Sequence, residues 1–274
     1  MSNETILSKS LNRAFRGGVS GFSAMCVQVT SLMWLRTIMN FQYRHGGTIK
    51  NSISTLYKDG GVLRFYRGYA AAISIGPLSR FGDTAANSFA ISLCDDSTPT
   101  AIKTLSGSAL ASSWRIFLMP IDALKTNLQV NGNLQGLKNN IKVNGIKSVY
   151  NGTTASMTAT FVGHYPWFLT YNILSEKIPE QDTVAKTLMR NATIGFTSSV
   201  VSDCVSNSLR VVKTVKQTNN NKSSYKNIIT AIIEKDGIHS LLGRGLKTRI
   251  LTNAVQGMMF TVCWKYFENK LSTT

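Results

Sequence analysis

The chain has 274 residues, which is enough for one or two domains with a large hydrophobic core. Apolar residues make up 43% and charged residues 16% of it, and the mean hydropathy is −0.00. This composition excludes a disordered chain, which needs low hydrophobicity, and also excludes a simple bundle of wholly apolar spans. The net charge of +17 makes a polyanionic partner, either a nucleic acid or an anionic membrane surface, a first hypothesis.

Six long helices are predicted, at residues 11–40, 70–94, 101–130, 154–177, 184–217 and 247–271. Several of these segments contain about 20 residues with few charges, which is the length needed to cross the core of a bilayer. Together they predict an all-α membrane protein.

A threefold internal repeat organises these segments, with predicted boundaries at residues 1–100, 101–183 and 184–274. In each repeat, a first apolar segment ends in a basic stretch. A polar loop with a glycine turn follows, and then a second apolar segment. The basic stretches begin at Ser31, Pro120 and Ser208, so their spacing is nearly constant. We therefore expect three pseudo-symmetric helix-loop-helix units around a central cavity.

The charge distribution indicates a membrane topology. The loops at 37–69, 126–153 and 214–246 hold thirteen Lys and Arg but only three acidic residues, whereas the opposite side has a small acidic excess. A one-sided excess of Lys and Arg between apolar spans is the positive-inside pattern, which places both termini on the other side. Because no stacking aromatic residues are interleaved with the basic clusters, a nucleic-acid partner is not expected.

No catalytic or metal-binding pattern is present in the sequence. The four cysteines lie far apart, without a CxxC pair or a nearby histidine, so neither a zinc site nor a disulfide framework is predicted. A Walker loop and a GxGxxG fingerprint are missing, and the three histidines are remote from one another. The first ten residues do not form the basic-then-apolar pattern of a secretory signal. We expect neither an enzyme nor a cofactor.

The second repeat has a proline, an acid, a base and an amide at fixed spacing, Pro120, Asp122, Lys125 and Gln129. The first has an aromatic-basic-glycine turn at residues 66–68. Both patterns, with their threefold spacing, resemble the mitochondrial carrier family over essentially the whole chain. The resemblance implies six transmembrane helices around a pseudo-threefold axis and a central solute cavity that opens alternately to either side of the inner mitochondrial membrane. It also implies a salt-bridge gate and cardiolipin bound at the glycine turns, with the chain acting as a monomer.

Several positions depart from the family pattern. Repeat 1 has Ser31 and Met33 in place of the proline and the acid, and repeat 3 has Ser208 and Arg210. Asp122 is then the one acid facing four basic residues, and we expect it to pair with Lys213. The expected gate comprises Arg36, Asp122, Lys125, Arg210 and Lys213, with the amides Asn40, Gln129 and Gln217. At residues 87–91, 171–175 and 264–268, where the family has an outer gate, the ionic pattern is missing or reversed.

Residues that break the threefold symmetry inside the cavity are candidates for substrate binding. Counting back five residues from the proline or serine position gives Cys26, Arg115 and Asp203, which lie at one depth. Arg115 and Asp203 are unusual in a membrane and indicate either a binding site or a mutual salt bridge between two helices. The further candidates are Ile75, Ala159, Thr160, His164, Thr252 and Gln256, followed by Arg80 and Asp83, which could instead pair with each other.

The glycine turns open helices whose free N–H groups attract anions. The resemblance therefore implies cardiolipin or another anionic lipid at Tyr66, Arg67, Gly68, Gly152, Arg244 and Gly245. A plain helix start is the alternative for these turns. For the whole chain we expect a transporter of a small polar or charged solute in the mitochondrial inner membrane. The alternatives are a carrier-derived scaffold that binds lipid or partners without transport, and a soluble basic helical-repeat protein.

Overall fold

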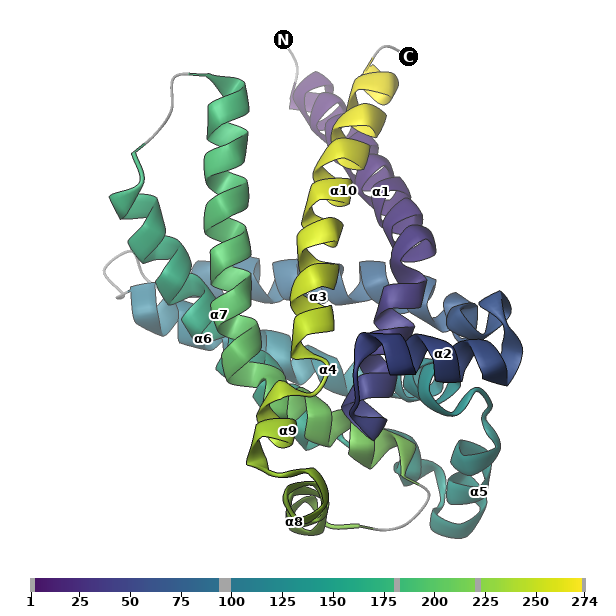
Figure 1. Ribbon diagram of the computed structural model, residues 1–274. Coiled ribbons are helices and arrows are strands. Elements are labelled where there is room, and N and C mark those ends of the chain that lie inside the picture. Colours follow the sequence, from purple (N-terminus) through teal and green to yellow (C-terminus); the bar gives the residue numbers. More distant parts are fainter. Residues whose placement is uncertain (1–2, 94–99, 180–182, 220–222, 273–274) are drawn as a thin grey trace.

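The computed structural model describes residues 3–93, 100–179, 183–219 and 223–272, and within these residues all regular structure is helical (Figure 1). The long helices are α1 (Asn3–His45), α3 (Tyr69–Leu93), α4 (Thr100–Asn131), α6 (Thr153–Lys177), α7 (Val184–Thr218) and α10 (Leu246–Ser272). Apart from their ends, these helices coincide with the predicted segments. In this part of the chain, none of the helices is both long and apolar enough to span a membrane.

Shorter helices fill the three basic loops. They are α2 (Ile49–Gly60), η1 (Val62–Tyr66), α5 (Gln135–Asn144), η2 (Ile146–Tyr150), α8 (Tyr225–Asp236) and α9 (Ile238–Gly243). Local sequence starts two of them, because the hydroxyls of Thr48 and Ser224 accept hydrogen bonds from the backbone N–H groups of Asn51 and Asn227. In Figure 1, α5, α8 and α9 lie at the end of the molecule away from both termini.

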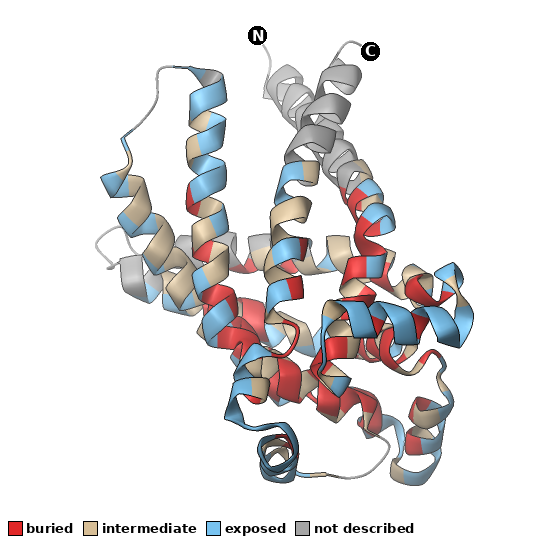
Figure 2. Cartoon of the chain, in the orientation of Figure 1, coloured by how far each residue is buried: buried red, intermediate tan, exposed pale blue. Residues whose placement is uncertain are grey.

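Buried side chains concentrate where the long helices meet these shorter ones (Figure 2). The strongest packing joins α6 with α7, α3 with α4, and α1 with α10. One buried apolar cluster includes Tyr43 of α1, Val211 and Val215 of α7, and Ile228 and Ile232 of α8. Burial of these side chains ties the end of α1 to α7 and α8. This packing holds the third basic loop, which contains α8, against the ends of α1 and α7.

The glycines of the three predicted turns let helices approach closely. Gly68, Gly152 and Gly245 have φ values of 88°, 88° and 65°, a region that favours glycine. A Cβ atom on Gly68 would lie 3.1 Å from the carbonyl oxygen of Lys125, and one on Gly152 would lie 3.1 Å from that of Lys213. Two of the turns therefore pack beside Lys125 and Lys213, which are predicted for the gate, and Gly245 packs against Tyr43 and Met39 of α1.

A buried arginine joins the first basic loop to α4. Arg64 is 1% exposed and donates to the carbonyl oxygens of Gln129 at 2.9 Å and Val130 at 2.8 Å. Its Nε also lies 2.5 Å from the carboxylate of Asp59. A cation at these free carbonyls is favourable because the C-terminal end of a helix carries partial negative charge. The sequence analysis counted Arg64 only among the basic residues of the first loop. In the structure it links that loop to the end of α4.

Candidate functional site

A central cavity of about 360 Å³ lies among the six long helices. Side chains from α1, α3, α4, α6, α7 and α10 line it. Its basic residues are Arg36, Arg115, Lys125, Arg210, Lys213 and Arg249, and its acidic residues are Asp83 and Asp122. Six formal positive charges against two negative ones leave an excess of four on the lining.

A second cavity, of about 270 Å³, adjoins the first. The residues that border both cavities are Arg36, Lys125, Arg210, Lys213, Arg249 and Gln256. We call the five basic members of this set the basic layer. Asn40, Tyr43 and Gln129 line only the second cavity, which therefore lies on the basic-loop side of that layer.

Asp122 is the acidic centre of the basic layer. Its carboxylate is buried and lies 2.5 Å from Lys125 Nζ, which is one helical turn away on α4. The other carboxylate oxygen pairs with Lys213 of α7 and accepts a hydrogen bond of 3.2 Å from Gln217. The predicted pair between Asp122 and Lys213 is thus present. One carboxylate shared by two lysines links α4 to α7.

Two amides predicted for the gate contact each other and the sulfur of Met33, which stands where the family pattern has an acid. Asn40 Nδ2 donates to Gln129 Oε1 at 2.5 Å, and Gln129 Nε2 lies 3.4 Å from the sulfur of Met33. Arg36 donates to Gln256 Oε1 at 3.0 Å. Among the residues that the structure describes, Arg210 forms no ion pair, and its Nε lies 3.2 Å from Ser206 Oγ.

Arg115 borders the central cavity, but its charge is already matched by a neighbouring helix. Its Nη2 lies 2.8 and 3.0 Å from the two carboxylate oxygens of Asp83, and its Nη1 contacts Ser79. The buried Nε has no hydrogen-bond partner among the described atoms. The side chain of Arg80, the alternative partner predicted for Asp83, lies outside the described side chains.

The hypothesis that Asp203 pairs with Arg115 is wrong. Asp203 is 3% exposed, and its carboxylate lies 2.5 Å from Arg249 Nε and accepts a further hydrogen bond from Asn253. It lines neither cavity described above. α3 packs on α4 and α10 packs on α7, and each of these two charges has its counter-charge on that packed helix. Asp203 therefore joins α7 to α10 beneath the cavity surface.

The remaining substrate candidates divide by helix face. Ile75, Thr160, His164 and Gln256 line the central cavity, and Thr252 lines the second cavity. Ala159 is buried at 1% exposure, and Cys26 is half-buried, and neither borders a cavity described here. On α6 the selected residues Thr160 and His164 themselves reach the cavity, whereas on α1 Met25, the neighbour of Cys26, is the side chain that lines it.

Arg249 and Ser79 are cavity residues that the sequence interpretation did not select. Arg249 precedes Gln256 by seven residues, so both lie on one face of α10. That periodicity was a usable signal. Nothing in the spacing along the chain points to Ser79, because its role depends on the approach of Arg115 from α4.

The residues predicted for lipid binding make protein contacts in this structure. Arg67 is exposed and donates to the carbonyl oxygen of Gly132 at 3.0 Å, while Tyr66 is half-buried. Arg244 is 8% exposed and pairs with Asp236. With the close approach of the turn glycines, these contacts give the turns a packing role, and lipid binding there stays a prediction.

Within the residues that the structure describes, the protein is α-helical and its long helices surround a charged central cavity. A family model described as "Mitochondrial carrier protein" matches residues 96–182 and 184–274. The chain therefore belongs to the mitochondrial carrier family. It is also 26% identical over 256 residues to "Mitochondrial substrate carrier family protein C" of Dictyostelium discoideum. The matched region covers 84% of this chain and 52% of that protein. The chain spans about half the length of this curated relative.

Proposed function

We propose that this protein transports a small anionic solute across the mitochondrial inner membrane by alternating access. In this proposal the six long helices cross the membrane as three pseudo-symmetric repeats, with both termini on the side opposite the basic loops. Family membership supports the general class, and the one-sided distribution of Lys and Arg supports the orientation. The observation that carries the solute class is the excess of four positive charges on the cavity lining.

An anion suits this cavity because an uncompensated cluster of cations is costly in a membrane interior. Asp83 and Asp122 offset part of the charge, and Asp203 neutralises Arg249 from behind the cavity surface. A bound anion would offset the remainder. A zwitterion or a cation would bring no such gain, so the expectation of a general polar or charged solute narrows to an anion.

The basic layer supplies the mechanism. Asp122 holds α4 and α7 together through Lys125 and Lys213 on the basic-loop side of the central cavity. An anion that binds these lysines competes with the carboxylate and weakens the link between the two helices. Opening toward the basic-loop side becomes accessible only when the solute replaces part of that interaction. The solute itself thereby lowers the barrier to its release.

Transport in liposomes tests this proposal. The purified protein, reconstituted with labelled small anions, cations and zwitterions inside and outside, is expected to give saturable exchange of anions only. Arg210→Gln removes a cavity charge that forms no ion pair among the described residues, and we expect it to slow anion exchange at least about tenfold. Lys226→Gln, on the exposed side of α8, is the matched control and should leave exchange unchanged.

A saturable exchange of cations by the wild-type protein would refute the anion assignment. Binding of anions without any exchange would instead support the alternative of a carrier-derived scaffold that does not transport. A lipid requirement and the monomeric state are further predictions of family membership, and light scattering of the detergent-solubilised protein tests the latter.

A further inference from the structure

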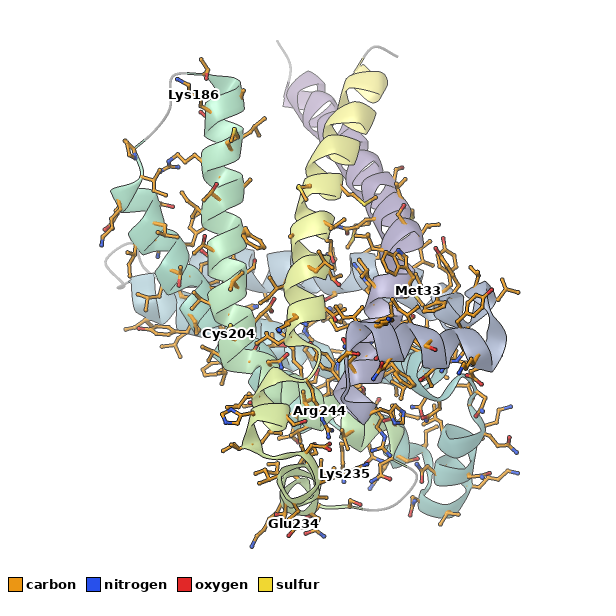
Figure 3. The ribbon with its side chains drawn as sticks, viewed as in Figure 1. Met33, Lys186, Cys204, Glu234, Lys235 and Arg244 are labelled. Carbon is orange, nitrogen blue, oxygen red and sulfur yellow. The ribbon has the colours of Figure 1, made fainter. Side chains whose placement is uncertain are left out.

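A third cavity, of about 320 Å³, lies outside the central chamber, between the end of α1, the end of α7 and α8. We call it the basic groove, after Arg44, His45, Lys235 and Arg244 in its lining. Figure 3 labels Lys235 and Arg244 at the same end of the molecule, beside α8 and α9. The groove shares no lining residue with the central cavity or with the second cavity.

The positive charge of the groove is only partly matched. Asp236 pairs with Arg244, which is 8% exposed. Among the described residues, Arg44 and Lys235 form no ion pair. Gly46 follows the end of α1 with a φ of 74°, and a Cβ atom there would lie 3.2 Å from Arg244 Nε. This turn lets the guanidinium group of Arg244 approach the end of α1, where Arg44 also lies.

Burial and the same basic side chains lower the pKa of His45. His45 lies beyond residue 40, where the predicted first span ends. Partial burial, and then the nearby charges of Arg44, Lys235 and Arg244, lower the pKa of His45 from 6.5 to about 4. Burial and then Arg244 also lower the pKa of Arg44. The groove as it stands is therefore a region of repulsion among cations.

The rest of the lining is suited to a ligand with an apolar portion. Val215, Ile228 and Ile232 are buried members of the apolar cluster and also line the groove. Asn227 adds a side-chain amide to the wall. The groove therefore combines a floor of aliphatic side chains with basic groups.

We propose that the basic groove binds a phosphate-bearing anion at a site separate from the central cavity. Guanidinium groups match the geometry of phosphate oxygens, and a lysine ammonium adds a compact charge. The volume of the groove exceeds that of a single phosphate group, so the phosphate is one part of a larger ligand. The phosphate comes either from a soluble molecule or from a lipid headgroup.

Binding measurements on the full-length protein in detergent test this site. Pyrophosphate serves as the soluble probe in calorimetric titration, and cardiolipin retained per protein, measured by native mass spectrometry, serves as the lipid probe. The test variant is Arg44→Gln/Lys235→Gln. Lys226→Gln is the control for the α8 half of this variant, because it removes one lysine charge from α8 at a residue that does not line the groove. Arg210→Gln removes a charge of the central cavity and separates binding there from binding in the groove.

A soluble ligand is indicated if the double variant weakens the affinity of one pyrophosphate site by at least about tenfold, while Lys226→Gln and Arg210→Gln retain that site. A lipid ligand is indicated if retained cardiolipin falls in the double variant and not in Lys226→Gln. The proposal is overturned if the double variant matches Lys226→Gln in both measurements. Lys235→Gln alone, which changes an exposed side chain, gives the same comparison if the double variant fails to fold.

Discussion

Replacing Asp122 with asparagine should destabilise the protein more than a single substitution of any of the five residues of the basic layer. The carboxylate is 6% exposed and contacts two lysines, one on its own helix and one on α7. Asp122→Asn keeps the shape of the side chain and removes the charge. Lys125 and Lys213 would then face each other, and the other cations of the layer, without a carboxylate between them.

The expected loss of stability follows from burial. Removing one partner of a buried ion pair costs about 3–5 kcal/mol, because the other charge stays buried without compensation. The side chains of Lys125 and Lys213 are 20% and 21% exposed, so water screens them in part. We therefore expect a decrease of about 3 kcal/mol in the free energy of unfolding, at the lower end of that range. Thermal and denaturant unfolding in lipid-supplemented detergent measure it.

A second substitution checks the cause. Lys213→Gln in the Asp122→Asn background removes one of the two uncompensated cations, and we expect it to restore about 1 kcal/mol. In the wild-type background Lys213→Gln leaves Asp122 paired with Lys125, so its effect should be smaller than that of Asp122→Asn. If Asp122→Asn unfolds with the same free energy as the wild-type protein, the carboxylate does not hold α4 and α7 together and the mechanism proposed above is wrong.

Three further predictions concern residues outside the basic layer. Arg64→Gln breaks the contacts to the last carbonyls of α4 and should lower the free energy of unfolding by about 2–3 kcal/mol. Proteolysis between α4 and α5 should become faster, and an unchanged cleavage rate would contradict this prediction. Gly245→Ala puts a Cβ atom 2.8 Å from the ring of Tyr43 at a φ of 65°, so it should lower the thermal midpoint, whereas an equal midpoint would show that the turn tolerates a side chain. The pKa of His45 is lower in the folded state, so the contribution of this side chain to stability is present above pH 6.5 and is lost as the pH falls toward 4. His45→Gln should flatten this pH dependence of the unfolding free energy. An identical pH profile in the variant would contradict the prediction.

Much of the architecture could be predicted from local patterns. Long stretches of apolar and small residues bounded by glycine and polar segments predicted the long helices, because helix formation depends on residues close together in the chain. The repeat placed Asp122 and Lys213 on equivalent turns of neighbouring helices, and the structure pairs them. The repeat also predicted the turn glycines, although the reason for Gly68 is the close approach of Lys125, which the sequence does not show.

The separate partners of Arg115 and Asp203 could not be predicted in this way. Helical counting gives the depth of each residue and the face on which it lies, and both were placed at one depth. It does not give the distance to each neighbouring helix, and that distance decides which carboxylate a cation meets. Because α3 packs on α4, Arg115 pairs with Asp83, and because α10 packs on α7, Asp203 pairs with Arg249.

The sequence by itself therefore determined where the helices lie along the chain and the basic character of the loops between them, because these properties depend on residue type and spacing along the chain. Only the tertiary structure decided which charges are neutralised, which remain in the cavity lining, and that Arg44, Lys235 and Arg244 meet in a groove. Electrostatic energy falls with distance between side chains. Those distances are set by helix packing between segments far apart in the sequence.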